Sequence, residues 1–554
     1  MKRNIIILLA LLPMLFTAKA AETVKVDSVG MLAKQLPDSI RFTIAELKVS
    51  GPLNGQDLKL LQQIVTRTKT NKKNPSECLV TSIDLSEVTI EEGKEGIKTK
   101  AGELPANLFA GAKSLQKVVL PLNITAIGKS CFENCESLTE ITLPETVTQI
   151  GNGAFEDCKS LPSLVLPENL KAIEANAFEG CKAFTTMELP AGIRVLEADV
   201  FKECTGLTAI TLPKDLSKIG DEAFMGCEAL NNVEIPEDVK EIGVSAFKKC
   251  TALANIQMDD VNKIGNYAFE NCVNLSEVTL KNIAKIGSDA FEGCSSLKSV
   301  TLDGPLDELS EDIFKNCTSL TDVTIPNSVK TIANEAFAEC KNLAAVILPD
   351  GLTKIGTHAF EGCATLRQMT IPNLVKNIGS SAFENCTSLD SVAINCFITE
   401  ISSNLFRSCH SLRSITIPNT VKKIGSDAFR DCTTLADVTL PLALTSIGDD
   451  AFAKCSSLVS MTIPVAVKEI GSSAFEECVM LSSVELSSAL KKIGGSAFAK
   501  CASLKTVILN GSAPPAISRS TFKGTNPTFL IPRGSAVIYT NNKDWKNISG
   551  FKEK

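Results

Sequence analysis

The chain has 554 residues, of which 44% are hydrophobic and 21% charged, and these proportions are typical of a folded protein. Its net charge of −7 argues against nucleic acid as a partner, because binding to phosphate backbones requires a basic face. One Trp and two Tyr leave few of the residues that usually anchor interfaces or stack against sugars and bases.

The first twenty residues have the three-part order of a secretory signal. Lys2 and Arg3 come first, an apolar run from Ile5 to Phe16 follows, and the small residues Ala18 and Ala20 end the segment. A buried N-terminal helix is the alternative interpretation. The run is too short to span a bilayer and no other stretch approaches 18 apolar residues, so we expect no transmembrane segment. The sequence thus predicts an exported chain, either secreted or at the cell surface.

Residues 21–102 lack the repeat that fills the rest of the chain, and their pattern predicts a small α+β cap. Repeat arrays need such atypical ends, because an uncovered end would expose its apolar cross-section to water. The expected segments are a helix over 30–36, a strand over 44–49 ended by residues 50–52, a helix that begins at Asn54 or Asp57 and reaches Val65, a polar loop over 66–74, and a strand over 79–85.

A repeat array extends from residue 103 to 525. Its period is 23 residues and falls to 22 only between Cys250 and Cys294. Each unit contains a Phe followed three residues later by a Cys, and this cysteine ladder has seventeen members, from Cys135 to Cys501. About eighteen units of 22 or 23 residues in nearly constant register predict one long solenoid instead of several globular domains.

The first half of a unit is illustrated by residues 409–432. Ile415 and Ile417 flank Thr416, and this alternation predicts a short strand with the isoleucines inward and Thr416 facing solvent. Pro418 is expected to end the strand, because proline cannot donate to a ladder of hydrogen bonds.

The second half of the unit returns the chain to its starting side. Val421 and Ile424 begin a second extended piece, and Ala428 and Phe429 point inward over a helical or 3₁₀ turn. A single unit buries too little apolar surface to offset the ordering of its residues, so the units must stack with their strands in parallel.

The repeat pattern Leu-x-x-Ile-x-Ile-Pro-x-x-Val-x-x-Ile-Gly-x-x-Ala-Phe-x-x-Cys, as at residues 412–432, resembles the BspA-like bacterial leucine-rich repeat family. The resemblance covers about 101–522, and segments 47–58 and 529–545 are similar to the ends of secreted members. It implies a leucine-rich repeat solenoid, mainly β, with a parallel sheet of short strands, a small α+β cap at the N-terminus and a second cap over 526–554. It also implies export and a role in adhesion or binding, with no catalytic residue and no cofactor.

The cysteine ladder invites a disulfide interpretation, since the chain has twenty Cys and is expected to be exported. Stacked units would place successive Cβ atoms about 4.8 Å apart, whereas a disulfide needs about 3.8 Å. A linear ladder also lacks the tetrahedral convergence of a metal site. We therefore expect small apolar thiols at inward positions.

The outward residue between the two inward strand positions is Thr in nine of eighteen units. One interpretation is β propensity with Thr pairing between neighbouring strands. The other is a flat, weakly charged strip that binds a partner through many weak contacts. The strip predicted for binding consists of Thr279, Thr301, Thr324, Thr370, Arg413, Ser414, Thr416, Thr439 and Thr462.

The irregular units offer further candidate sites. Residues 257–312 gather acidic residues that could hold Ca²⁺, but a solvated acidic face is favoured. Residues 395–397 replace the usual polar turn, and repacking of Phe397 is favoured over its exposure as a contact point. His358 and His410 occupy different positions in the repeat, so we expect neither a catalytic arrangement nor a metal site.

The sequence therefore predicts a non-enzymatic, exported leucine-rich repeat protein that mediates protein–protein interaction or adhesion at the bacterial cell surface. Its expected partners are host extracellular or bacterial surface proteins. A protein that binds polysaccharide is the alternative, and a hydrolase is a third, remote one, because catalysis needs a preorganised constellation that the residues do not supply. The oligomeric state is not indicated.

Overall fold

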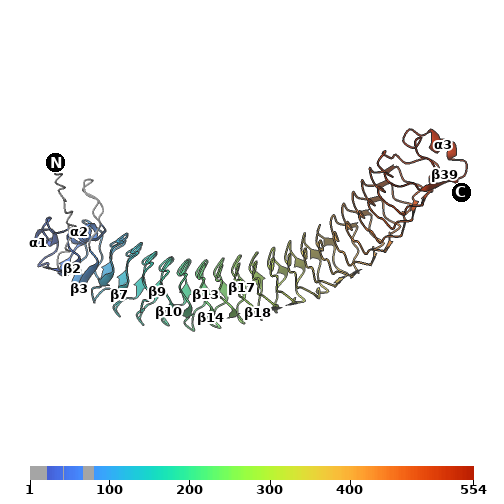
Figure 1. Cartoon of the computed structure of the whole chain (residues 1–554). Helices are drawn as coiled ribbons and strands as arrows, with labels where there is room; N and C mark the ends of the chain where they lie inside the picture. Colours follow the sequence, from blue (N-terminus) through green and yellow to red (C-terminus); the bar gives the residue numbers. More distant parts are fainter. Residues whose placement is uncertain (1–20, 42, 67–79) are drawn as a thin grey trace, which may run out of the picture. The chain divides into compact units, whose positions relative to one another are not determined.

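The computed structural model describes residues 21–41, 43–66 and 80–554 (Figure 1). The expected signal and most of the predicted polar loop over 66–74 lie outside the described residues. The chain forms two compact units, Met1–Gly192 and Ile193–Lys554, and each is described by itself. The predicted boundaries at residues 20, 102 and 525 stay predictions. Among the described residues, no helix has the length and apolar composition needed to cross a membrane.

The N-terminal part of the first unit combines three parallel strands with two helices. Two of its strands and both helices match predicted segments, and β3 extends the predicted strand over 79–85 to Ile90. The sheet order is β1-β2-β3-β5-β7, so the cap continues directly into the first repeat strands. The elements are β1 (Glu22–Lys25), α1 (Leu32–Gln35), β2 (Glu46–Leu53), α2 (Gly55–Thr66) and β3 (Ser82–Ile90).

Strand β2 continues beyond the point where Gly51 and Pro52 were expected to end it. Gly51 adopts a φ of +96°, which glycine tolerates, and the register with β3 shifts between Lys48 and Ser50. Strand β1 pairs with β2 only as far as Ser50. Pro52 therefore lies at a stretch without a neighbour on that side, where the absence of its N–H costs little.

The choice between Asn54 and Asp57 as the start of α2 is decided in favour of Asn54. Its Oδ1 accepts hydrogen bonds from the backbone N–H groups of Gln56 at 3.0 Å and Asp57 at 3.2 Å. The buried carboxylate of Asp57 accepts instead from the N–H groups of Gly30 at 2.6 Å and Leu32 at 3.0 Å. Asp57 thus ties the first turn of α1 to α2.

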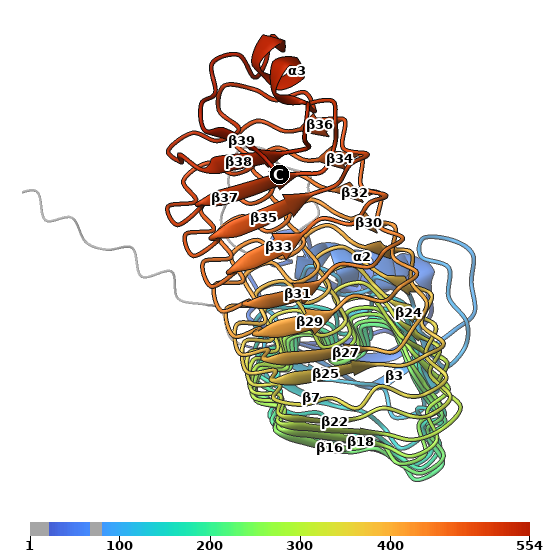
Figure 2. The same ribbon diagram turned by 90° about the vertical axis from the view of Figure 1, so that its right-hand side faces the viewer.

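Each repeat contributes to three rows, which we call face A, face B and the turn face. In residues 409–432 they are the strand at 414–416, the strand at 423–424 and the turns at 426–432. Figure 2 shows face A as the row β29, β31, β33, β35 and β37, with β30, β32, β34 and β36 in a second row. Paired strands of neighbouring repeats are parallel and join equivalent residues, as Thr416 joins Thr439. The leucine-rich repeat solenoid is thereby confirmed.

The face A strands are three or four residues long. In the first unit they are β5 (Lys117–Val119), β7 (Glu140–Thr142) and β10 (Thr186–Glu188). In the second unit they are β12 (Ala209–Thr211), β14 (Asn232–Glu234), β16 (Asn255–Gln257), β18 (Glu277–Leu280), β20 (Ser299–Leu302), β22 (Asp322–Thr324), β25 (Gln368–Ile371), β27 (Ser391–Ile394), β29 (Ser414–Thr416), β31 (Asp437–Thr439), β33 (Ser460–Thr462), β35 (Ser483–Leu486) and β37 (Thr506–Leu509).

The face B strands are two residues long. In the first unit they are β4 (Glu103–Leu104), β6 (Ala126–Ile127), β8 (Gln149–Ile150) and β9 (Ala172–Ile173). In the second unit they are β11 (Val195–Leu196), β13 (Lys218–Ile219), β15 (Glu241–Ile242), β17 (Lys263–Ile264), β19 (Lys285–Ile286), β21 (Glu308–Leu309), β23 (Thr331–Ile332), β24 (Lys354–Ile355), β26 (Asn377–Ile378), β28 (Glu400–Ile401), β30 (Lys423–Ile424), β32 (Ser446–Ile447), β34 (Glu469–Ile470) and β36 (Lys492–Ile493).

The turn face is built from hydrogen-bonded turns where a helical or 3₁₀ turn was expected. Asp427 and Asp431 have φ values of 54° and 59°, and left-handed residues cannot continue a right-handed helix. The N–H groups of Asp427, Phe429 and Asp431 instead donate to backbone carbonyls of the next repeat at 2.8–2.9 Å. The turns therefore form a third hydrogen-bonded connection between stacked repeats.

The core consists of the inward residues that the repeat pattern predicts. Ile415, Val421 and Phe429 are buried. None of the seventeen ladder cysteines, all within the described part of the chain, forms a disulfide. Cys432 is typical, since it is buried and its Sγ donates to the backbone carbonyl of Phe406 at 3.1 Å. This donation gives the thiol a partner within an otherwise apolar interior.

An aromatic cluster closes the C-terminal end of the second unit. The strands β38 (Thr528–Ile531) and β39 (Phe551–Glu553) extend the sheet after β37, and α3 (Ala536–Asn541) lies between them in sequence. Trp545 is buried, and its Nε1 donates to the carbonyl of Pro515 at 2.7 Å. The hydroxyl of Tyr539 donates to the carbonyl of Gly511 at 2.8 Å.

Candidate binding surface

The nine predicted strip residues are exposed on face A of the second unit. The pairing of β18, β20 and β22 makes Thr279, Thr301 and Thr324 direct neighbours. Thr416 and Thr439 are neighbours in the same way on β29 and β31. The structure thus brings together two groups of strip threonines, each at cross-strand contact distance.

The strip is not uniform along its length. Between β22 and β25 the described residues 343–349 form no regular strand. Thr370, on β25, has Ala393 as its neighbour on β27, and Thr462 faces Glu485. The predicted threonines therefore form separate groups with other side chains between them, and not one continuous ladder.

Arg413 and Ser414 lie at the edge of face A where β29 begins. Arg413 helps to line a shallow pocket of about 290 Å³ together with Arg367 and Asp390 from the two preceding repeats. The pocket contains charges of both signs, so it offers hydrogen bonds and weak ion pairs to a polar group of a partner.

The exposed apolar residues of face A give the surface its most distinctive feature. Ile347 is 87% exposed, Leu374 53% and Phe397 78%, and they come from three successive repeats. Ile347 occupies the outward strand position, whereas Leu374 and Phe397 occupy equivalent positions in the turn after the strand. We call these three residues the apolar patch.

The expectation that Phe397 would repack into the interior is wrong. Ile398 fills the inward position that corresponds to Val421 in the regular unit, and Cys396 is also buried. No inward position is left for the ring, so it stays in solvent. Leu374 was missed, although its place one residue before the inward Val375 was a signal that it points outward.

An open groove of about 880 Å³ is lined by two residues of the apolar patch, Ile347 and Leu374. Its lining also includes Thr370 and Asn395 but not Phe397, and Asp350 is the one charged residue among the lining residues. The groove thus combines aliphatic side chains with a few polar groups, which is the usual chemistry of a site that buries part of a ligand.

The acidic stretch over 257–312 does not form one site. Asp259 is paired with Lys281 at 2.5 Å on an exposed surface, and Asp312 is paired with Lys315 at 2.9 Å on the turn face. These contacts place the acidic side chains in separate surroundings, as expected for a solvated acidic surface.

The chain is similar to known proteins in sequence and in structure. A family model described as "BspA type Leucine rich repeat region (6 copies)" matches residues 102–231, 195–321, 307–436 and 423–539. No curated protein matches the chain at a significant level.

Several solved structures are similar. A leucine-rich repeat protein from Bacteroides ovatus is 26% identical, over 83% of this chain and 97% of that chain, with a TM-score of 0.46. A leucine rich cell surface protein from Faecalibacterium prausnitzii is 26% identical, over 60% and 88%, with a TM-score of 0.38. A leucine-rich repeat protein from Eubacterium ventriosum is 23% identical, over 68% and 89%, with a TM-score of 0.32.

Proposed function

The chain belongs to the BspA-type leucine-rich repeat family, and on that premise we propose that it is an exported, non-enzymatic protein that binds another protein through face A. Proteins built from such repeats are generally scaffolds for protein interaction. The proposed contact consists of the apolar patch and its groove, flanked by the strip threonines and Arg413. The expected partner is a protein of the host extracellular surface or of a neighbouring bacterial surface, and the role is adhesion.

The apolar patch is the observation that carries this proposal. Burial of one large aliphatic or aromatic side chain contributes about 1.5–3 kcal/mol, so complete burial of the three patch residues contributes at most about 4.5–9 kcal/mol before costs. Association itself costs an estimated 4–15 kcal/mol. The patch alone therefore does not suffice, and the partner must extend along face A to use the weaker contacts of the strip as well.

A protein partner fits this surface better than a polysaccharide. Sugar sites are commonly built on exposed Trp or Tyr rings, but Trp545 and Tyr539 are buried in the C-terminal cluster. Tyr267, which is 38% exposed, lies on the turn face and not on face A. On face A, Phe397 is the one exposed aromatic ring among the described residues. Aliphatic side chains such as Ile347 and Leu374 are more suited to the apolar side chains of a protein.

The test begins with capture of partners. The mature chain, residues 21–554, would be immobilised and exposed to serum, to extracellular matrix and to surface extracts of neighbouring bacteria, and the retained proteins identified by mass spectrometry. The affinity of each partner would then be measured for the double variant Leu374→Lys and Phe397→Lys. We expect a loss of at least tenfold, because about 1.4 kcal/mol corresponds to tenfold.

The double variant Val537→Lys and Ile538→Lys is the matched control. The two residues are 68% and 51% exposed on α3, outside the strip and the groove lining, so their replacement adds the same two charges and should leave the affinity unchanged. If the double variant Leu374→Lys and Phe397→Lys binds a partner with the same affinity as the unchanged chain, the binding site lies outside the apolar patch. Retention of glycans on an array, weakened by Phe397→Ala, would favour the polysaccharide alternative.

A further inference from the structure

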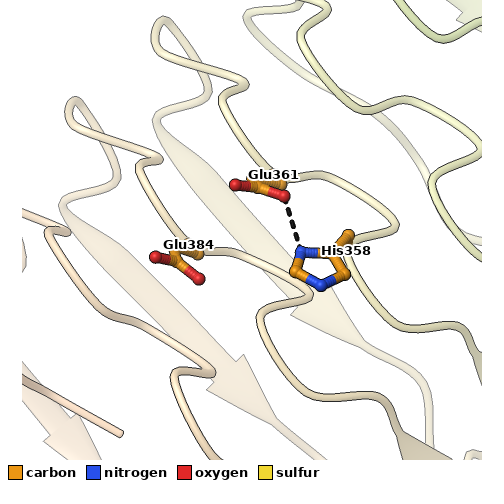
Figure 3. Close-up of side chains that lie close together, drawn as sticks. All are labelled: His358, Glu361 and Glu384. Carbon is orange, nitrogen blue, oxygen red and sulfur yellow. Dashed lines mark hydrogen bonds and ion pairs between the residues drawn. The ribbon is translucent and has the colours of Figure 1, made fainter. Parts of the chain in front are cut away.

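His358, Glu361 and Glu384 form a cluster on the turn face of the second unit. Nδ1 of His358 lies 2.6 Å from Oε2 of Glu361, and Glu384 comes from the next repeat (Figure 3). One ligand atom from each residue lies within 4.8 Å of the others. The three side chains are partly exposed, so an ion from solution can reach them.

The stacking of the repeats explains why such side chains meet. Each repeat contains the Phe of the Phe-x-x-Cys pattern. On the turn face, the residue that follows this Phe lies near the residue two positions before it, and also near the corresponding residue of the next repeat. In some other repeats the residue that follows the Phe is a Lys or Arg, and it lies between two carboxylates. Lys315 is 2.9 Å from Asp312 and 2.6 Å from Glu335, and Arg430 contacts Asp427 and Asp450 at 3.0–3.1 Å.

The charges are reversed at His358. Glu361 and Glu384 occupy the position that Lys315 and Arg430 hold in other repeats, and His358 occupies the position of Asp312 and Asp427. Glu361 neighbours His358 within one repeat, and Glu384 holds the same position as Glu361 in the next repeat, so two carboxylates lie close to one imidazole. In those other repeats the side chain of Lys315 or Arg430 neutralises the two carboxylates. Here two carboxylates and an imidazole are ligands suited to a metal ion from solution.

We propose that His358, Glu361 and Glu384 bind a Zn²⁺ ion. Zn²⁺ is bound by His nitrogen and carboxylate oxygen at about 2.0–2.2 Å, whereas Ca²⁺ and Mg²⁺ prefer oxygen ligands alone. Tetrahedral ligands at these bond lengths lie about 3.3–3.5 Å apart. The three ligand atoms lie within 4.8 Å of one another, so the partly exposed side chains must rotate to reach this spacing when the ion binds. Three protein ligands leave one position for water or for a ligand atom from a partner.

Three neighbouring groups bear on the affinity. Arg407 lies 3.5 Å from Oε1 of Glu384 and competes for that carboxylate, so it weakens binding. Cys363 and Cys386 each follow a proposed ligand by two residues. Both are buried, donate to the carbonyls of Phe337 and Phe360 at 3.3 and 3.2 Å, and have pKa values raised by burial. They do not supply the thiolate that Zn²⁺ would otherwise prefer.

The test is calorimetric titration of ZnCl₂ into the metal-free full chain. We expect one ion per chain and a loss of affinity of at least tenfold in His358→Asn, Glu361→Gln and Glu384→Gln. Asn is chosen because Asn176 and Asn404 occupy the same repeat position with the same left-handed φ, so His358→Asn should fold normally. Arg407→Gln should bind Zn²⁺ more tightly, which loss of structure would not produce.

His410→Asn is the matched control and should bind like the unchanged chain, since His410 occupies a different position in the repeat. The visible absorption of Co²⁺ should depend on His358 in the same way. Absence of Zn²⁺ binding would overturn the proposal. Binding that is unaffected by His358→Asn would also overturn it and would assign the ion to another group, such as a thiol.

Discussion

Asp289 shows how the repeats place like charges side by side. It lies on the turn face of the second unit, with Glu292 in its own repeat, Asp312 in the next and Glu270 in the preceding one. Burial, followed by the charges of Asp312, Glu292 and Glu270, raises the pKa of Asp289 to about 6. Asp312 is paired with Lys315 at 2.9 Å and Glu270 with Lys248 at 2.5 Å, so these two lysines neutralise neighbours of Asp289 and not Asp289 itself.

The raised pKa predicts a pH dependence of stability. Between pH of about 4 and 6 the folded chain holds a proton on Asp289 that the unfolded chain releases, so this contribution to stability falls as the pH rises through the window. Asp289→Asn should therefore stabilise the chain at pH 7, by a few tenths to about 1 kcal/mol after solvent screening. Its effect should nearly vanish at pH 4.

Urea unfolding at the two pH values measures the difference. Asp259→Asn is the control, because it removes an acid from an exposed pair with Lys281 and should change the free energy of unfolding by less than about 0.5 kcal/mol. A destabilised Asp289→Asn chain at pH 7 would contradict the prediction.

The phenylalanine ladder is the element that joins one repeat to the next. The ring of Phe291 is stacked 5.2 Å from Phe269 and 5.7 Å from Phe314, measured between ring centroids, and it is fully buried. Stacked repeats contact only their neighbours, so a defect in one repeat acts mainly on the two beside it.

Phe291→Ala should cost about 3–5 kcal/mol, because it removes a large buried side chain and leaves a cavity. Hydrogen exchange should show lost protection in β18, β20 and β22 and unchanged protection in β2 and β3. Phe397→Ala deletes the same ring from an exposed position and should alter stability by less than about 0.5 kcal/mol. If both variants lose the same free energy of unfolding, contacts between the stacked Phe rings do not hold neighbouring repeats together.

At the scale of the whole molecule, the two ends of the array are closed by different means. Asp57 joins the helices of the N-terminal cap through charge-assisted hydrogen bonds, while Trp545 closes the other end against Phe529, Tyr539 and Phe551. Long arrays of repeats often unfold in more than one step, because each repeat contacts only its neighbours.

Trp545 is the chain's one Trp, so its fluorescence reports on the C-terminal end alone. We expect the urea midpoint from fluorescence to differ from the midpoint from far-ultraviolet circular dichroism, which averages over all repeats. Asp57→Asn weakens bonds worth about 1.5–3 kcal/mol each and should shift the circular dichroism transition without moving the fluorescence midpoint. Coincident transitions would show instead that the chain unfolds as one cooperative unit.

Much of the fold could be predicted from the repeat. The inward places of Ile415, Val421 and Phe429 were correct because a period of 23 residues allows only one phase in which every apolar position is covered. The turn face was less predictable: Asp427 and Asp431 adopt left-handed conformations that the composition of the turn did not reveal. The strip residues were correctly expected to be exposed, while their use in binding stays a prediction.

The stacked solenoid, its parallel strands and its closed ends are thus determined by the amino-acid sequence, because stacking in this register is the arrangement that buries the periodic apolar residues. The apolar groove and the His358 cluster are different. Leu374, Phe397 and Glu384 each look like ordinary variation within one repeat, and they acquire a role only when stacking brings residues 22 or 23 positions apart into contact. Which outward side chains meet is decided by register and rotamer between repeats, and the pattern within a single repeat does not contain that information.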